Sequence, residues 1–163
     1  MTTTRAASEN GTIVLVRKKL LVIEDGTEYE EFARTFLGAR FDVATAHSST
    51  EAIEALRREA IDALFVDLRF ERAPASALVG DVDATARRLF GGDRARALRW
   101  VKDQQGTLVL AEIRKAGFAQ RAVFVHDFPE ERLRNLGKLY GDVRAVASFD
   151  AAAIAAIFSD GAV

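Results

Sequence analysis

Three carboxylates stand where two short apolar runs end, and their positions suit a site at the edge of a sheet. Glu24 and Asp25 directly follow the run 20–23, and Asp67 directly follows the run 63–66. Ligands of open parallel sheets bind beyond the carboxyl ends of the strands. If the two runs are neighbouring strands, the acids converge, and we expect them to hold Mg²⁺ together with a backbone carbonyl and water. Taken singly, each is a solvated acid at the start of a loop.

The composition narrows the chemistry further. The 163 residues include no cysteine and two histidines, which excludes disulfides, a thiolate nucleophile and zinc sites built on sulfur or on three histidines. The net charge of -1 argues against a nucleic-acid partner bound by bulk electrostatics. The sequence contains neither an apolar run that approaches the ~20 residues of a membrane span nor a secretory signal. We therefore expect a cytoplasmic protein with no direct contact to a membrane.

Short apolar runs alternate with amphipathic segments along most of the chain. This alternation is typical of βαβ units and predicts an α/β fold with a mostly parallel sheet. The expected strands are 20–23, 41–44, 63–66, 122–125 and 143–146, and the expected helices are 29–37, 52–60, 106–114, 129–139 and 151–158.

The ends of these elements carry their own signals. Thr27 is expected to cap the first helix and Gly38 to end it, and Ser49 or Thr50 is expected to cap the second. The apolar residues 13–16 either extend the first core strand or form an edge strand. We expect residues 1–12 to be a flexible N-terminal segment and residues 13–163 to be a single domain.

An insertion at about 71–105 interrupts the alternation of expected strands and helices. Residues 72–80 are rich in alanine and contain Pro74, so we interpret them as a loop; helical pieces at 85–90 and 95–101 are separated by Gly91-Gly92. The insertion is either a solvated surface, a docking surface or a lid over the acids. Trp100 either anchors an interface or packs on the body of the protein.

The order and spacing of these motifs resemble those of response-regulator receiver domains. The segment 20–25 followed by a helix is similar to the start of that family, with its acidic pair after the first strand. The segment 64–67 is similar to the third strand, which carries the phosphoryl-accepting aspartate. The segment 106–114 opens with glycine and carries Ile-Arg seven and eight residues later, like the family's third helix. The resemblance covers about 19–158 without the insertion, and implies a flavodoxin-like, doubly wound, five-stranded parallel sheet flanked by helices.

The resemblance also implies a function. Asp67 would take a phosphoryl group as a nucleophile, and Mg²⁺ would be held by Asp25 and Asp67 directly, by Glu24 through water and by the backbone carbonyl of Arg69. The expected protein is a signalling module and not an enzyme. Its expected partner is a sensor histidine kinase or a downstream protein, and a homodimer is compatible with the sequence.

Three departures from the family keep a second hypothesis open. His126 stands where the fourth strand normally ends in Thr or Ser, and Ser148 lies near the position of the usual lysine after the fifth strand. Gly106 follows Asp67 by 39 residues, far more than in the family. His126 either contacts a phosphoryl group or is a partly buried histidine bonded to a backbone carbonyl. The second hypothesis is a phosphorylation-independent pseudo-receiver that acts as a constitutive protein-interaction module.

A third class, a phosphatase, is suggested only by the segment 81–85. Its Asp-x-Asp-x-Thr pattern is similar to that of haloacid-dehalogenase-type phosphatases. The first aspartate of those enzymes is a nucleophile at the end of the first, central strand. Here the pattern begins in the middle of the chain and would leave the first three strands without a role.

Overall fold

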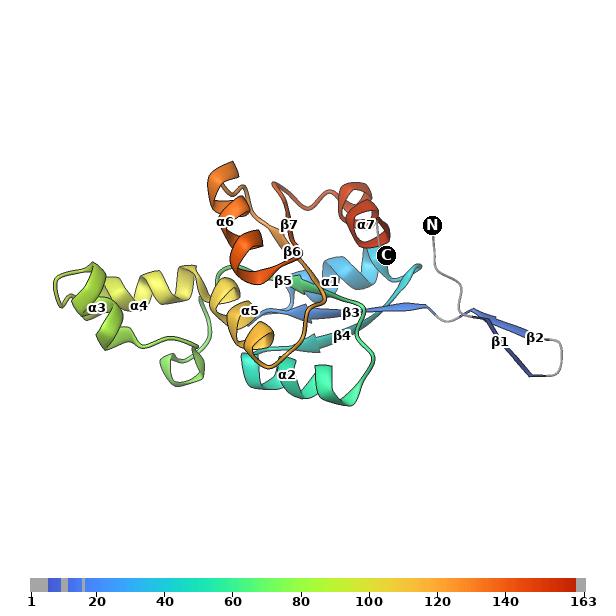
Figure 1. Ribbon diagram of the computed structural model, residues 1–163, viewed down its shortest axis with the longest axis horizontal. Helices are drawn as coiled ribbons and strands as arrows, with labels where there is room; N and C mark the ends of the chain where they lie inside the picture. Colours follow the sequence, from blue (N-terminus) through green and yellow to red (C-terminus); the bar gives the residue numbers. More distant parts are fainter. Residues whose placement is uncertain (1–5, 10–11, 16, 161–163) are drawn as a thin grey trace.

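A five-stranded parallel sheet lies at the centre of the computed structural model, which describes residues 6–9, 12–15 and 17–160 (Figure 1). The strand order is β4-β3-β5-β6-β7, and every neighbouring pair is parallel. This order confirms the predicted doubly wound, flavodoxin-like sheet. The five strands are β3 (Lys18–Ile23), β4 (Phe41–Ala46), β5 (Ala63–Val66), β6 (Arg121–Val125) and β7 (Val143–Val146).

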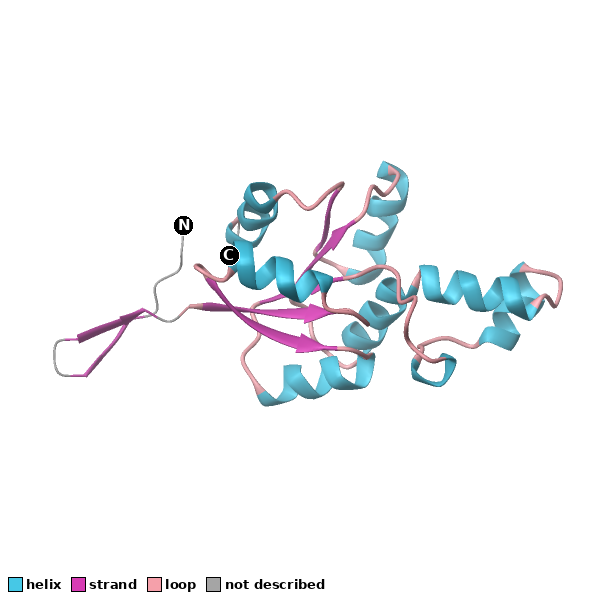
Figure 2. Ribbon diagram, turned by 180° about the vertical axis from the view of Figure 1, so that it is seen from behind, coloured by secondary structure: helices cyan, strands magenta, loops and turns pink. Residues whose placement is uncertain are grey.

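Helices cover both faces of the sheet (Figure 2). One face carries α1 (Glu28–Phe32), its π-helical continuation η1 (Ala33–Leu37), and α7 (Ala151–Ser159); the other carries α2 (Ser49–Arg58), α5 (Gln105–Lys115) and α6 (Glu130–Tyr140). Strand β3 contributes to both cores, because successive side chains of a strand point to opposite faces. Leu20 and Val22 pack with the first group, and Leu21 and Ile23 with the second. Within the described residues, no helix combines the length and the apolar character that a membrane span requires.

One of the predicted helix caps was wrong, and the other was confirmed in its position. Ser48, and not Ser49 or Thr50, caps α2, and its hydroxyl accepts the N–H of Glu51 at 3.2 Å. The cap residue must keep an extended backbone, whereas Ser49 and Thr50 are already helical. Thr27 stands at the N-cap of α1 without a capping hydrogen bond from its side chain.

For residues 13–16, the prediction of a separate strand was confirmed for 13–15, whereas the alternative of an extended first core strand was wrong. Residues Thr12–Leu15 form β2, which pairs with β1 (Ala6–Glu9) in a separate antiparallel sheet, and Val16 lies outside the described residues. Residues 13–15 therefore neither extend β3 nor join the edge of the main sheet, because they pair with the preceding strand β1. Strand β1 lies within the N-terminal segment 1–12.

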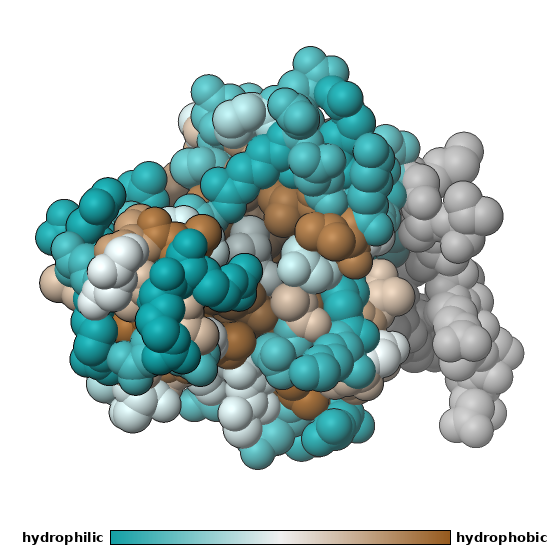
Figure 3. Space-filling model, turned by 60° about the vertical axis from the view of Figure 1, so that its left-hand side comes forward, coloured by the Kyte–Doolittle hydropathy of each residue, from teal (hydrophilic) through white to brown (hydrophobic). Residues whose placement is uncertain are grey.

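The insertion leaves the sheet after β5 and returns at α5. It contains a short 3-10 turn, η2 (Ala75–Ala77), and two helices, α3 (Val82–Leu89) and α4 (Arg94–Asp103). The helices reverse direction at Gly91 and Gly92, whose positive φ angles of 58° and 90° suit glycine. Figure 1 shows α3 and α4 extending from one end of the molecule, and Figure 3 turns this end forward and shows hydrophobic patches among hydrophilic residues. Leu89 and Trp100 are among the exposed apolar residues of the insertion, so Trp100 is not packed in the core.

Candidate functional site

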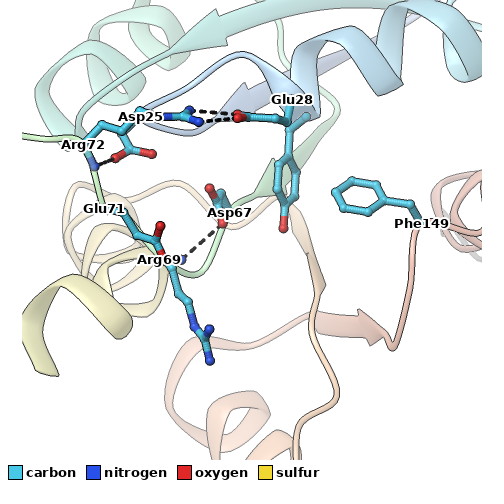
Figure 4. A pocket seen from close by; sticks show the side chains of 8 residues that line it. Asp25, Glu28, Asp67, Arg69, Glu71, Arg72 and Phe149 are labelled. Carbon is cyan, nitrogen blue, oxygen red and sulfur yellow. Dashed lines mark hydrogen bonds and ion pairs between the residues drawn. The ribbon is translucent and has the colours of Figure 1, made fainter. Parts of the chain in front are cut away.

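The register of the central strands brings the predicted acids to one edge of the sheet. Ile23 of β3 pairs with Val66 of β5, so Glu24, Asp25 and Asp67 leave two adjacent strands at the same level. Asp25 and Asp67 line one pocket of about 260 Å³ (Figure 4). The pocket is lined by Asp25, Glu28, Tyr29, Asp67, Arg69, Glu71, Arg72 and Phe149.

Asp67 is held by its backbone, and within the described residues its carboxylate accepts one backbone N–H. Its N–H donates to the carbonyl of Ile23 at 2.9 Å, and its Oδ1 accepts the N–H of Arg69 at 3.2 Å. The guanidinium of Arg69 extends away from this carboxylate (Figure 4). Burial raises the pKa of Asp67 to about 7, against the lowering effect of the Arg69 hydrogen bond, and the charges of Asp25 and Glu24 add to the increase. A nearby cation would relieve this unfavourable charge.

Glu24 occupies a different environment from the other two acids. Its side chain is 1% exposed, and its two oxygens accept the N–H groups of Tyr29 at 3.0 Å and Glu30 at 2.7 Å. Glu24 therefore caps α1 in place of Thr27, because the first N–H groups of a helix have no partner within the helix. Its water-mediated contact to a metal stays a prediction. Its backbone carbonyl accepts a hydrogen bond from Nδ1 of His47 at 2.9 Å if that nitrogen is protonated.

Asp25 is bonded to the start of the insertion, a contact that the sequence analysis missed. Its Oδ2 accepts the N–H of Arg72 and that of Ala73, the latter at 3.1 Å. The guanidinium of Arg72 pairs with both carboxylate oxygens of Glu28 and holds the pKa of this exposed carboxyl below its ordinary value. Since Arg72 follows Asp25 by 47 residues, no local pattern could reveal this contact.

Two aromatic rings form one side of the pocket. Tyr29 and Phe149 meet edge to face with ring centroids 4.9 Å apart. Burial and the charge of Asp67 raise the pKa of Tyr29, so its hydroxyl keeps its proton near neutral pH. Ser148 is exposed two residues beyond the end of β7, and Phe149, the next residue, lines the pocket in its place. Periodicity identified Tyr29 only as a core position of α1, and gave no signal for Phe149.

His126 lies at the end of β6, as predicted, but is not among the residues that line the pocket. Its backbone N–H donates to the carbonyl of Val146 at 2.8 Å, and its ring packs edge-on against Phe128 with centroids 4.6 Å apart. Burial lowers the pKa of His126, and the positive charges of Arg69 and Arg132 lower it further. The imidazole is therefore mainly neutral at pH 7.

The donor set fits a hydrated divalent cation. Within the described part of the chain, no group of three His, Cys, Asp or Glu residues forms a ready-made metal cluster. The pocket nevertheless carries four acids against two arginines, and the carboxylates of Asp25 and Asp67 are among its oxygen donors. A contact of the backbone carbonyl of Arg69 to a metal stays a prediction. Mg²⁺ commonly takes one or two carboxylates and keeps several waters, so these few ligands suffice.

The phosphatase motif has no comparable setting. Asp81 caps α3 by accepting the N–H of Ala84 at 2.9 Å, and Asp83 pairs with Arg94. Both aspartates are exposed in the insertion, and neither follows a strand. The pattern is explained by local helix capping and an exposed ion pair.

Solved structures of response-regulator receiver domains share this fold. A receiver protein from Pseudomonas putida has a TM-score of 0.58 and 16% identity, over 91% of this chain and 100% of that chain. The Francisella response regulator 1452 receiver domain has a TM-score of 0.55 and 14% identity, with 87% and 93% coverage. A response regulator from Burkholderia pseudomallei, solved with a phosphorylated aspartic acid, a calcium ion and citrate, has a TM-score of 0.57 and 16% identity, with 88% and 68% coverage. Neither a family model nor a curated protein matches the sequence. The chain thus has the receiver-domain fold, as the motifs predicted.

The raised pKa of Asp67 predicts a pH-dependent gain of stability in Asp67→Asn. The folded protein favours the protonated carboxyl of Asp67, because the pKa is higher in the folded state than in the unfolded chain. The stability that this carboxyl contributes is therefore complete below pH 3.8 and is lost as the pH rises through about 7. Without divalent cations, the variant should gain about 1–2 kcal/mol in free energy of unfolding at pH 8, allowing for partial exposure. Urea denaturation at pH 8 and pH 4 measures this, with little gain expected at pH 4. An equal gain at both pH values would contradict the prediction.

Proposed function

We propose that this protein is a receiver-type signalling module in which Asp67 accepts a phosphoryl group. A carboxylate oxygen of Asp67 attacks the phosphorus of an activated donor; the new P–O bond forms while the bond to the leaving group breaks, and the leaving group keeps the electron pair. One observation carries the proposal. Asp67 directly follows the central strand and lines an acidic pocket beside Asp25, and in the described part of the chain its side chain accepts one backbone N–H.

The residues of the pocket have distinct roles in this reaction. Asp25, Asp67 and the backbone carbonyl of Arg69 would hold Mg²⁺ together with water, and the bound cation would supply positive charge against the phosphoryl oxygens. The N–H of Arg69 orients the carboxylate of Asp67. The packed rings of Tyr29 and Phe149 form an apolar side of the pocket.

The proposed donor is a sensor histidine kinase or a small acyl phosphate in the cytoplasm. The output is a protein-protein interaction, since the phosphoryl group is held as a signal and the module is not a turnover enzyme. Nucleic acid and membranes are not direct partners in this proposal.

Phosphoryl transfer can be measured directly by mass spectrometry. The protein is incubated with MgCl₂ and millimolar acetyl phosphate, and intact mass is recorded. We expect one added phosphoryl group on the wild type and none on Asp67→Asn. Asp127→Asn is the matched control, because Asp127 is an exposed carboxylate just beyond β6 and should leave the transfer unchanged.

The second candidate is the phosphorylation-independent pseudo-receiver. It is favoured by Phe149, which lines the pocket beside Asp67 in a chain with no lysine near this position, and by the bonds that the insertion already makes to Asp25. A folded wild type that takes up no phosphoryl group from millimolar donor would replace the first proposal by this one.

A further inference from the structure

The first residues of the insertion are hydrogen-bonded to Asp25, a carboxylate that the proposed cation site requires. The backbone N–H groups of Arg72 and Ala73, here called the insertion root, both donate to Oδ2 of Asp25. Within the described residues, Oδ1 of Asp25 accepts no hydrogen bond, so one carboxylate is shared between the insertion and the pocket. A change of charge in the pocket therefore acts directly on the insertion root.

The side chain of Arg72 adds a positive charge to the same pocket. Its guanidinium pairs with both oxygens of Glu28, and the two side chains are 61% and 58% exposed (Figure 4). An exposed pair contributes little to stability and is released readily. Arg72 thus acts as an internal counter-cation that is weakly held among the four acids of the pocket.

Gly26 provides the space in which this pair lies. A Cβ atom at residue 26 would overlap the guanidinium of Arg72 and the carboxylate of Glu28. Because these are the far ends of flexible side chains, an alanine would displace the pair without forcing the backbone to move. Gly26→Ala therefore disturbs the contact and leaves the number of charges unchanged.

The insertion root lies between two fixed points. The N–H of Phe70 donates to the carbonyl of Lys102 at 3.0 Å, and Val79 exchanges hydrogen bonds of 2.7 and 3.0 Å with the side chain of Gln105. The loop 71–78 between them is mostly exposed. The root can therefore move while α3 and α4 keep their attachment to the body.

We propose that the insertion root and a divalent cation compete for the acidic pocket, so that the loop 71–78 responds to occupation of the site. This inference rests on the cation site of the proposed function. A cation on Asp25 weakens the charge-assisted bonds from the two N–H groups and repels the guanidinium of Arg72. The coupling is reciprocal: the factor by which a bound cation weakens the contacts of Arg72 equals the factor by which release of Arg72 raises the affinity for the cation. The loop then supplies a response to the site that needs neither Thr nor Lys at the positions of His126 and Ser148.

A titration of the full chain with MgCl₂ alone, followed by NMR of the backbone amides, tests this competition. In the wild type, the amide signals of Arg72 and Ala73 should shift with the same midpoint as those beside Asp67. Arg72→Gln and Gly26→Ala should bind Mg²⁺ about three- to tenfold more tightly. Arg88→Gln, which removes a charge from an exposed position of α3, should match the wild type.

Each other outcome overturns the inference. Tighter binding in Arg72→Gln but not in Gly26→Ala would show an effect of net charge alone. Weaker binding in both would show that the root orients Asp25 and does not compete for it. Equal Mg²⁺ affinity in all variants would contradict only the competition proposed here. If the wild type bound no Mg²⁺, the cation would also be removed from the proposed function. The mass measurement with acetyl phosphate tests phosphoryl transfer separately.

Discussion

Gly106→Ala is expected to lower the free energy of unfolding by about 3 kcal/mol and to abolish phosphoryl transfer to Asp67. Gly106 is buried in the first turn of α5, and its N–H donates to the carbonyl of Leu68 at 2.8 Å. A Cβ atom there would overlap the backbone oxygen of Asp67 and would lie 2.8 Å from Cα of Leu68. The backbone on the other side cannot yield freely, because Asp67 is bonded to Ile23 of β3. Either α5 or Asp67 must therefore leave its position.

Gly137→Ala is the matched control for this substitution. Gly137 lies within α6, and a Cβ atom there would have no neighbour within 4 Å. Alanine should stabilise this helix by about 0.5–1 kcal/mol, since it is a better helix former than glycine. Urea denaturation of both variants, with the mass measurement for phosphoryl transfer, makes the comparison. A Gly106→Ala variant as stable and as reactive as the wild type would mean that α5 does not approach Asp67 so closely.

Gln105→Leu is expected to cost about 2 kcal/mol and to loosen the attachment of the insertion. The side chain of Gln105 is completely buried; its Oε1 accepts the N–H of Val79, and its Nε2 donates to the carbonyls of Val79 and Val101. Leucine has a similar size but neither donor nor acceptor, so the backbone groups of Val79 lose their partners. Unpaired groups of this kind cost more than the gain from an additional apolar side chain.

The measurement combines urea denaturation with limited digestion by trypsin, which cleaves after the arginines of the insertion. Gln105→Leu should be cut faster in the insertion than the wild type. Gln104→Leu is the neighbouring control; its side chain is half-buried and accepts a hydrogen bond from Arg132, so its loss should cost less than about 1 kcal/mol. Equal digestion of both variants would place the attachment of the insertion elsewhere.

The sequence was sufficient to predict the strands and the sheet edge at which the candidate site lies. The runs 20–23 and 63–66 are apolar throughout, which is typical of strands covered on both faces, and they form the adjacent strands β3 and β5. The acids that follow them could therefore be assigned to one edge before the structure was known. Gly106 was identified by its register with Ile113 and Arg114, and the structure supplies the physical reason for a glycine, which is contact with the backbone of Asp67.

The details of the helix ends were less predictable. A cap depends on which oxygen reaches the free N–H groups, and several residues near a helix start carry such an oxygen. For α2 the competing residues were adjacent, and Ser48 is the one with an extended backbone. For α1 the acceptor is Glu24, at the end of the preceding strand, which the sequence analysis placed at the metal site.

Local pattern thus determined the class of fold, the order of its elements and the carboxylates Asp25 and Asp67 at the sheet edge. Only the tertiary structure decided what each acid contacts: Glu24 faces α1, Asp67 faces the pocket, and Asp25 is bonded to Arg72 and Ala73 of the insertion. The physical reason is the separation in sequence between the residues that interact. Strand and helix patterns arise between residues a few positions apart, whereas the partners of Asp25 follow it by 47 and 48 residues and meet it only when the chain has folded.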